Sequence, residues 1–173
     1  MNREDDKNIL NSIPKELQPD FILMHLRNMW SVDGLYYLGI EEKFGTEIAT
    51  EIDRKVWEFM GKIEAKRLKK LFKYKGDDIS VLSKYLRLTA WVLDLDDKEI
   101  IEEKEKLIIR NVKCRIQDTR LSKGLKEFAC KNVRWGFLKS FAKEINSGIN
   151  VKCNVCPPDD HDEKLWCEWV FEF

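Results

Sequence analysis

The stretch KEIIEEKEKLIIRNVKC, residues 98–114, decides the fold, because the pattern of the chain changes there from helical to extended. Residues 99–103 and 107–114 are two β-rich pieces, and the charged residues 104–106 separate them. Apolar and β-branched runs of this length on either side of a short polar break are typical of a hairpin. We therefore expect two antiparallel strands with their turn at residues 104–106.

The sequence after this hairpin predicts one helix and a second pair of strands. Residues 132–146 carry apolar side chains at helical spacing, and residues 149–155 and 165–173 favour strands. Along the last strand, side chains alternate between two faces. The chain is thus expected to be α+β, with N-terminal helices followed by an antiparallel sheet of about four strands and a helix between the two hairpins.

The part of the chain before the hairpin, about residues 1–93, has helical periodicity. Apolar residues recur from Ile22, Asp33-Gly34 interrupts the pattern, and Gly45 stands where a helix would end. A long helix is predicted over residues 46–73. One face of this helix is marked by Ile48, Ile52, Val56, Phe59 and Ile63 and then by Leu68, Leu71 and Phe72.

Length and composition limit the class of protein. The chain has 173 residues, which suits one domain over 1–173, with a helical part over about 1–93 and a sheet and cysteine-rich part over about 98–173. Hydrophobic residues make up 43%, including six Trp and nine Phe, which is too much bulky apolar mass for a disordered chain.

Charge and hydropathy exclude further classes of protein. The 31 basic and 31 acidic residues cancel, although they alternate in blocks, and this argues against a dedicated nucleic-acid binder. No apolar run approaches the ~18 residues of a membrane span, and the charged N-terminus does not resemble a signal peptide. We therefore expect a cytoplasmic protein that does not bind membranes, in which thiols stay reduced.

Four of the five cysteines have the spacing of a metal site. Cys153 and Cys156 form a C-x-x-C pair, whose thiolates can turn toward one ion at about 2.3 Å. Cys167 follows on the expected partner strand, and Cys130 precedes the expected helix. Together they predict a closed, structural four-cysteine site for Zn²⁺. An iron–sulfur cluster uses the same ligands, His161 could replace one of them, and a cluster of small buried residues is the simpler alternative.

The fifth cysteine, Cys114, is the candidate catalytic nucleophile. Cys114 is followed by Arg115 and Arg120, and nearby cations would lower the pKa of a thiol and favour a nucleophile. No Ser-His-Asp or Cys-His pair is visible, since the chain has only two histidines. A buried strand cysteine is the alternative interpretation.

A candidate ligand pocket is suggested by aromatic residues around an acidic turn. Tyr hydroxyls and a carboxylate would place polar groups in an otherwise apolar, aromatic-lined pocket. The alternative is an ordinary aromatic core with surface ion pairs. The candidate ligand-binding residues are Trp30, Asp33, Tyr36, Tyr37, Trp57, Glu64, Arg67 and Arg120.

Several of these residues also carry a resemblance to known families. The chain resembles an uncharacterised prokaryotic family known only as a domain of unknown function, which is similar to the L-2-amino-thiazoline-4-carboxylic acid hydrolase-like family. The matching positions are Trp30, Asp33-Gly34-Leu35, Glu41 to Gly45, Val56-Trp57, Glu64 to Leu68, Cys114, Arg120, Gly124, Cys130, Cys153 to Asp159 and Trp166 to Trp169.

A more distant similarity is to 4-vinyl reductase type ligand-binding domains. That resemblance implies helices over an antiparallel sheet, an apolar small-molecule pocket and, as in some sensors, a zinc held by C-terminal cysteines. Some of those sensors carry Glu at the position of Cys153. Fold analogy does not fix function.

Three functions follow as hypotheses. The first is a small-molecule-binding or sensory domain with a structural zinc site of four cysteines. The second is a thiol-dependent hydrolase of a small cyclic amide-like substrate that uses Cys114, and the third is a protein-interaction subunit. A homodimer is also compatible with the sequence, because the aromatic N-terminal helices exceed what one small core needs.

Overall fold

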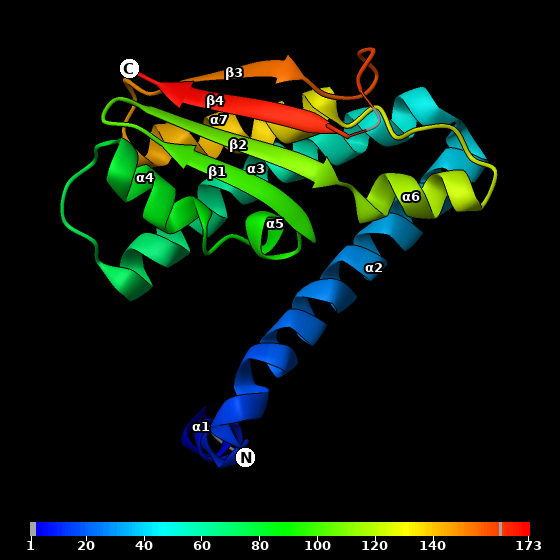
Figure 1. Ribbon diagram of the computed structural model, residues 1–173. Coiled ribbons are helices and arrows are strands. Elements are labelled where there is room, and N and C mark those ends of the chain that lie inside the picture. The colour runs from blue at the N-terminus through cyan, green and yellow to red at the C-terminus, as the bar shows by residue number, and fades with distance from the viewer. Residues whose placement is uncertain (1–2, 163) are drawn as a thin grey trace. The chain divides into compact units, whose positions relative to one another are not determined.

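The sheet is built from the two hairpins that the sequence predicts (Figure 1). The computed structural model describes residues 3–162 and 164–173. Every neighbouring pair of strands is antiparallel, and the order across the sheet is β1-β2-β4-β3. The α+β class is therefore confirmed. The strands are β1 (Asp97–Glu102), β2 (Lys106–Lys113), β3 (Asn150–Val155) and β4 (Cys167–Glu172).

The C-terminal strand β4 lies inside the sheet, and this explains its apolar sequence. Trp169 pairs with Ile109 of β2 on one side and with Cys153 of β3 on the other. Trp169 and Phe171 are fully buried. Because a central strand gains ladder hydrogen bonds on both edges, β4 joins the two hairpins into one sheet.

The helices occupy the first half of the chain and the connections between strands. None of those in the described part of the chain is long and apolar enough to cross a membrane. Their bounds are α1 (Arg3–Ser12), the short 3₁₀ helix η1 (Lys15–Leu17), α2 (Gln18–Phe44), α3 (Thr46–Phe72), α4 (Ile79–Leu86), α5 (Ala90–Leu93), α6 (Arg115–Ser122) and α7 (Lys131–Ile145).

The chain divides into two compact units within α2. The first unit is Met1–Tyr36, and its described part holds α1, η1 and the first turns of α2. The second unit, Tyr37–Phe173, holds the rest of α2 and all the other elements. The sheet, the five cysteines and the hydrophobic core described below all belong to the second unit.

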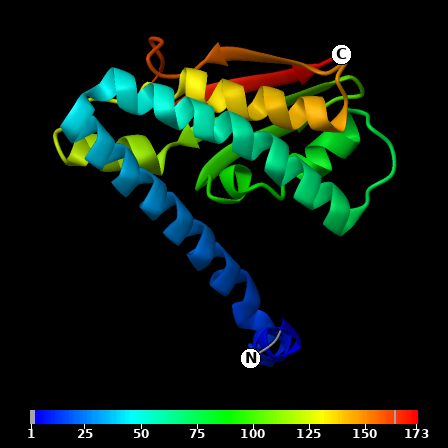
Figure 2. The ribbon, with the colours of Figure 1, turned by 180° about the vertical axis from the view of Figure 1, so that it is seen from behind.

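The core of the second unit is layered. Helix α7 packs on the sheet through buried residues that include Phe137, Leu138 and Phe141, and α3 runs beside α7 (Figure 2). Helix α4 contacts β1 and β2. Its N-cap is Asp78, whose carboxylate accepts a hydrogen bond from the backbone amide of Val81 at 2.9 Å.

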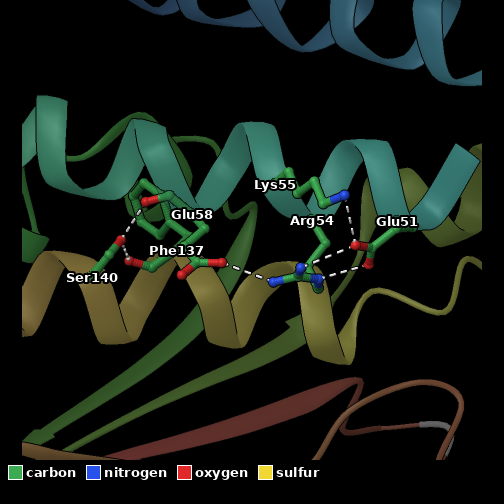
Figure 3. Close-up of polar contacts among 6 residues, drawn as sticks. All are labelled: Glu51, Arg54, Lys55, Glu58, Phe137 and Ser140. Carbon is green, nitrogen blue, oxygen red and sulfur yellow. Dashed lines mark hydrogen bonds and ion pairs between the residues drawn. The ribbon is translucent and has the colours of Figure 1, made fainter.

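Helices α3 and α7 approach each other closely because small residues lie between them. A Cβ on Gly61 would meet the carbonyl oxygen of Phe137 at 2.3 Å, so only glycine fits there. The Ser140 hydroxyl donates to the carbonyl oxygens of Glu58 at 2.6 Å and Phe137 at 3.0 Å (Figure 3). The buried residues of α3, which form its contact line with α7, are Ala49, Asp53, Trp57, Gly61 and Ala65.

Two sequence-based expectations about the helices differ from the structure. Asp33-Gly34 does not interrupt the helix, because α2 continues through it to Phe44. One glycine costs a helix only about 1 kcal/mol, which the neighbouring turns can offset. Helix α6 was not expected, and it begins directly after Cys114, so this cysteine caps a helix and lies outside the strand.

Candidate metal centre

The four cysteines of the predicted metal set come from three segments that the fold brings together. Cys130 is the N-cap residue of α7, Cys153 lies in β3, Cys156 follows β3, and Cys167 begins β4. The backbone amide of Lys131 donates to the carbonyl oxygen of Pro157 at 3.0 Å. This bond fixes the start of α7 against the loop that leaves β3.

Cys156 is the centre of the thiol cluster. Its Sγ atom lies 3.4 Å from that of Cys130, and the thiols of Cys153 and Cys167 lie near enough to shift its pKa. The hydrogen bond to Cys130 is the largest of the effects that raise the pKa of the Cys156 thiol. The pKa values of Cys153 and Cys167 are lowered, in each case first by the hydrogen bond with Cys156.

The chemistry of this donor set fits a soft divalent cation. Zinc–thiolate bonds of about 2.3 Å place the sulfurs of a tetrahedron about 3.8 Å apart. The sulfurs of Cys130 and Cys156 are slightly closer than that, at 3.4 Å. Across residues 3–162 and 164–173, no group of three or more His, Cys, Asp or Glu side chains has the arrangement of a formed metal site. The thiols are therefore gathered, but they do not surround a common centre.

Cationic side chains surround the cluster. Arg134 of α7 is buried, and although burial lowers its pKa, negative charge at Cys130, Cys167 and Cys156 opposes that effect. Lys131 forms an ion pair with Asp159 at 2.7 Å. Four thiolates around one Zn²⁺ would carry a net charge of −2. The positive charges of Arg134 and Lys131 would therefore stabilise such a centre.

Gln117 of α6 positions the segment that carries Cys130. Its side-chain amide donates to the carbonyl oxygen of Phe128 and accepts from the amide of the same residue, both at 2.8 Å. Its nitrogen also lies 3.8 Å from the Cys130 sulfur. Gln117 is fully buried, and nothing in its sequence spacing pointed to this role.

The surroundings of Cys114 do not favour the thiolate form that a nucleophile needs. Burial raises the pKa of its thiol to about 11, in the direction opposite to the expected one. The nearby cations are engaged elsewhere, because Arg115 binds Asp94 at 2.7 Å and Arg120 binds Glu41 at 3.0 Å. The raised pKa argues against the Cys114 thiolate, and the role of Cys114 as a nucleophile stays a prediction.

The candidate ligand-binding residues are distributed over both units. Trp30, Asp33 and Tyr36 belong to the first unit. In the second unit, the Tyr37 hydroxyl lies 2.9 Å from the Thr50 hydroxyl, and its ring makes an edge contact with Phe128. These contacts make Tyr37 part of the packing of its unit.

Three further candidates lie along α3, and two of them make contacts inside the second unit. Trp57 is buried against the Phe137 ring. Glu64 accepts a hydrogen bond from the amide of Ala90 at 3.0 Å, and burial raises its pKa. Arg67 is exposed. An apolar, aromatic-lined pocket around these residues stays a prediction.

Arg120 lines an open depression in the second unit. The hollow has a volume of about 570 Å³. The Arg120 guanidinium donates two hydrogen bonds of 3.0 Å to Glu41, and this pairing lowers the pKa of the Glu41 carboxyl. Six of the nine lining residues are polar or charged, but the surface that they expose in the depression is mostly apolar. Its lining is Leu38, Glu41, Glu42, Thr46, Arg120, Gly124, Leu125, Lys126 and Glu127.

Comparison with known protein families gives a match over most of the chain. A family model described as "Family of unknown function (DUF6125)" matches residues 11–173. No curated protein matches the chain. The resemblance to the hydrolase-like family and to 4-vinyl reductase type domains therefore stays a prediction.

Proposed function

The chain belongs to this family of unknown function, and we propose that it is a binding domain stabilised by one structural Zn²⁺. The observation that supports the proposal is the 3.4 Å contact between the thiols of Cys156 and Cys130, with Cys153 and Cys167 near enough to shift the pKa of Cys156. Four cysteines from three segments supply enough ligands for a complete tetrahedral site, whereas the C-x-x-C pair alone would supply two. Thiolate is also the ligand that Zn²⁺ prefers at structural sites.

A zinc at this position would have a structural role. Four protein ligands fill a tetrahedral shell, so no position is left for a substrate or a catalytic water. The metal would link the start of α7 to the exit of β3 and the start of β4. Binding energy at such sites contributes directly to folding, because the unfolded chain does not hold the ligands together.

Small-molecule binding remains our first proposal for the activity of this domain, with the depression beside Arg120 as the candidate site. Its lining combines charged side chains with a mostly apolar exposed surface, which fits a ligand that has both polar and apolar parts. The hydrolase hypothesis is the weaker alternative, since the Cys114 thiol has a raised pKa. An interaction subunit is the third proposal.

Serine variants of single cysteines test the metal proposal with a matched control. Cys156→Ser should lower the zinc content of the purified protein severalfold, whereas Cys114→Ser should leave it unchanged. If Cys156→Ser does not fold, native wild-type protein supplies the second test. Four of its thiols should react with a thiol reagent only after a chelator or a denaturant is added. Equal zinc loss in both variants, or five freely reacting thiols, would contradict the proposal.

The absorption spectrum distinguishes zinc from an iron–sulfur cluster. Zinc–thiolate centres are colourless in the visible range, because Zn²⁺ has a filled d shell. A cluster held by the same four cysteines would make the protein brown. If the protein shows a visible absorption band and Cys156→Ser lacks it, the four cysteines hold an iron–sulfur cluster and not zinc.

A further inference from the structure

Helix α3 has a largely exposed apolar face within the second unit. This face, called here the α3 stripe, consists of Ile48, Ile52, Val56, Phe59 and Ile63. The exposed fractions are 41% for Ile52, 51% for Val56 and 73% for Phe59. At 100° per residue, the five side chains fall within about 80° of the helix circumference. The stripe faces away from the line of Ala49, Trp57 and Gly61 that packs on α7.

The charges along α3 make the helix complementary to a reversed copy of itself. The half before Phe59 is mainly acidic, and the half after it is mainly basic. A second α3 in the antiparallel direction would therefore place acidic turns against basic turns, while a parallel copy would place like charges together. The exposed acidic residues before Phe59 are Glu47, Glu51 and Glu58, beside Arg54 and Lys55, since Asp53 lies on the buried line toward α7. The basic half carries Lys62, Lys66, Arg67, Lys69 and Lys70, beside the half-buried Glu64.

The spacing of the α3 stripe has the same symmetry. If two copies cross antiparallel about a twofold axis near Val56, Ile48 of one copy meets Ile63 of the other. In the same register Ile52 meets Phe59. Glu51 then lies within one turn of Lys62 of the second copy. One register therefore pairs apolar with apolar side chains and acidic with basic ones. A twofold interface requires this kind of self-complementarity.

We infer that the α3 stripe is the docking surface for a second copy of this chain, with the two α3 helices antiparallel about a twofold axis near Val56. The opposite line of α3 is already packed against α7, so association needs no rearrangement of the second unit. Flanking ion pairs within α3, such as Lys55 with Glu51 at 3.2 Å, would border the apolar contact (Figure 3).

Molar mass in solution tests the surface. Light scattering or sedimentation of the full chain should give twice 20.6 kDa. Phe59→Glu should reduce it to 20.6 kDa while leaving the circular dichroism spectrum unchanged. Leu71→Glu is the matched control, because Leu71 is on the same helix and 72% exposed but lies outside the stripe, and this variant should stay dimeric. A monomeric wild type would overturn the inference. The stripe would then be the docking surface for the first unit of the same chain or for another protein. A Phe59→Glu variant that stays dimeric would overturn the inference as well.

Cross-linking tests the direction of the two helices. Val56→Cys lies at the axis and should form a covalent dimer with a short thiol-bridging reagent, beyond the background of the wild-type cysteines. Ile48→Cys should not, because in the antiparallel pair its two copies are about 22 Å apart along the helices. A mixture of Ile48→Cys and Ile63→Cys should cross-link again. Efficient self-cross-linking of Ile48→Cys would indicate parallel helices and overturn the proposed register.

Discussion

Replacing Gly61 by alanine should destabilise the protein, because this glycine is where α3 and α7 approach most closely. The new Cβ would lie 2.3 Å from both the Phe137 carbonyl oxygen and the Ser140 hydroxyl. Real Cβ atoms essentially never make contacts under 3.0 Å, so these atoms must separate by at least 0.7 Å. The serine can rotate, but the carbonyl belongs to the backbone of a buried helix, so the helices themselves must shift.

The expected loss combines three terms. Overpacking a buried contact costs about 1–3 kcal/mol. Separation of the helices also weakens the hydrogen bond from Ser140 to the Glu58 carbonyl, worth about 1 kcal/mol. Alanine returns up to about 1 kcal/mol through its better helix propensity. The free energy of unfolding should therefore fall by about 1–3 kcal/mol, and a loss of about 2 kcal/mol corresponds to a melting temperature lower by roughly 4–8 °C.

Gly39→Ala is the matched control for this measurement. Gly39 lies inside α2, and a Cβ there would meet nothing within 4 Å. Only the propensity term acts, so this variant should be about 0.5–1 kcal/mol more stable than wild type. Thermal and urea unfolding of the three proteins, followed by circular dichroism, gives both differences. If Gly61→Ala is as stable as Gly39→Ala, the close helix contact is not present in the protein.

Three further predictions concern single side chains. Asp78→Ala removes the N-cap bond to Val81 and should lower the unfolding free energy by about 1 kcal/mol in urea, and an unchanged midpoint would contradict the cap. Arg120 lowers the pKa of Glu41, so this carboxylate stabilises the fold fully above its unfolded pKa of about 4.3 and loses that contribution as pH falls through its lower folded value. Glu41→Gln should therefore show less loss of stability than wild type on acidification below about pH 4.3, and parallel pH profiles would refute the coupling. Cys114, with a pKa of about 11, should be alkylated near neutral pH more slowly than free cysteine, as peptide mapping would measure, and faster alkylation would restore the nucleophile hypothesis.

The sheet could be predicted from the sequence because its signals are local. Two β-rich runs with a charged break define the hairpin of β1 and β2, and alternation marks β4 as a strand. The central place of β4 in the sheet is known only from its pairing with β2 and β3. The helix α6 was not predictable in this way, because Gln117 and Arg120 are polar residues that become buried only through tertiary contacts. Apolar periodicity marks a face of α3 but does not say what packs there. The face that is buried is the one with small residues, such as Ala49 and Gly61.

The candidate site was predictable to a similar extent. Spacing grouped Cys130, Cys153, Cys156 and Cys167, and the fold places the Cys130 thiol in contact with Cys156 and the other two near enough to shift its pKa. Their role as metal ligands stays a prediction. The surroundings depend on long-range geometry that no local pattern encodes, such as the burial of Arg134 beside these thiols.

The zinc content of the purified protein tests the central claim most directly. The full chain would be expressed without added metal, purified without chelators and measured by elemental analysis together with its protein concentration. Our account predicts about one zinc ion per chain, retained after dialysis and absent from Cys156→Ser. Protein that is folded by circular dichroism but contains neither zinc nor iron would contradict it.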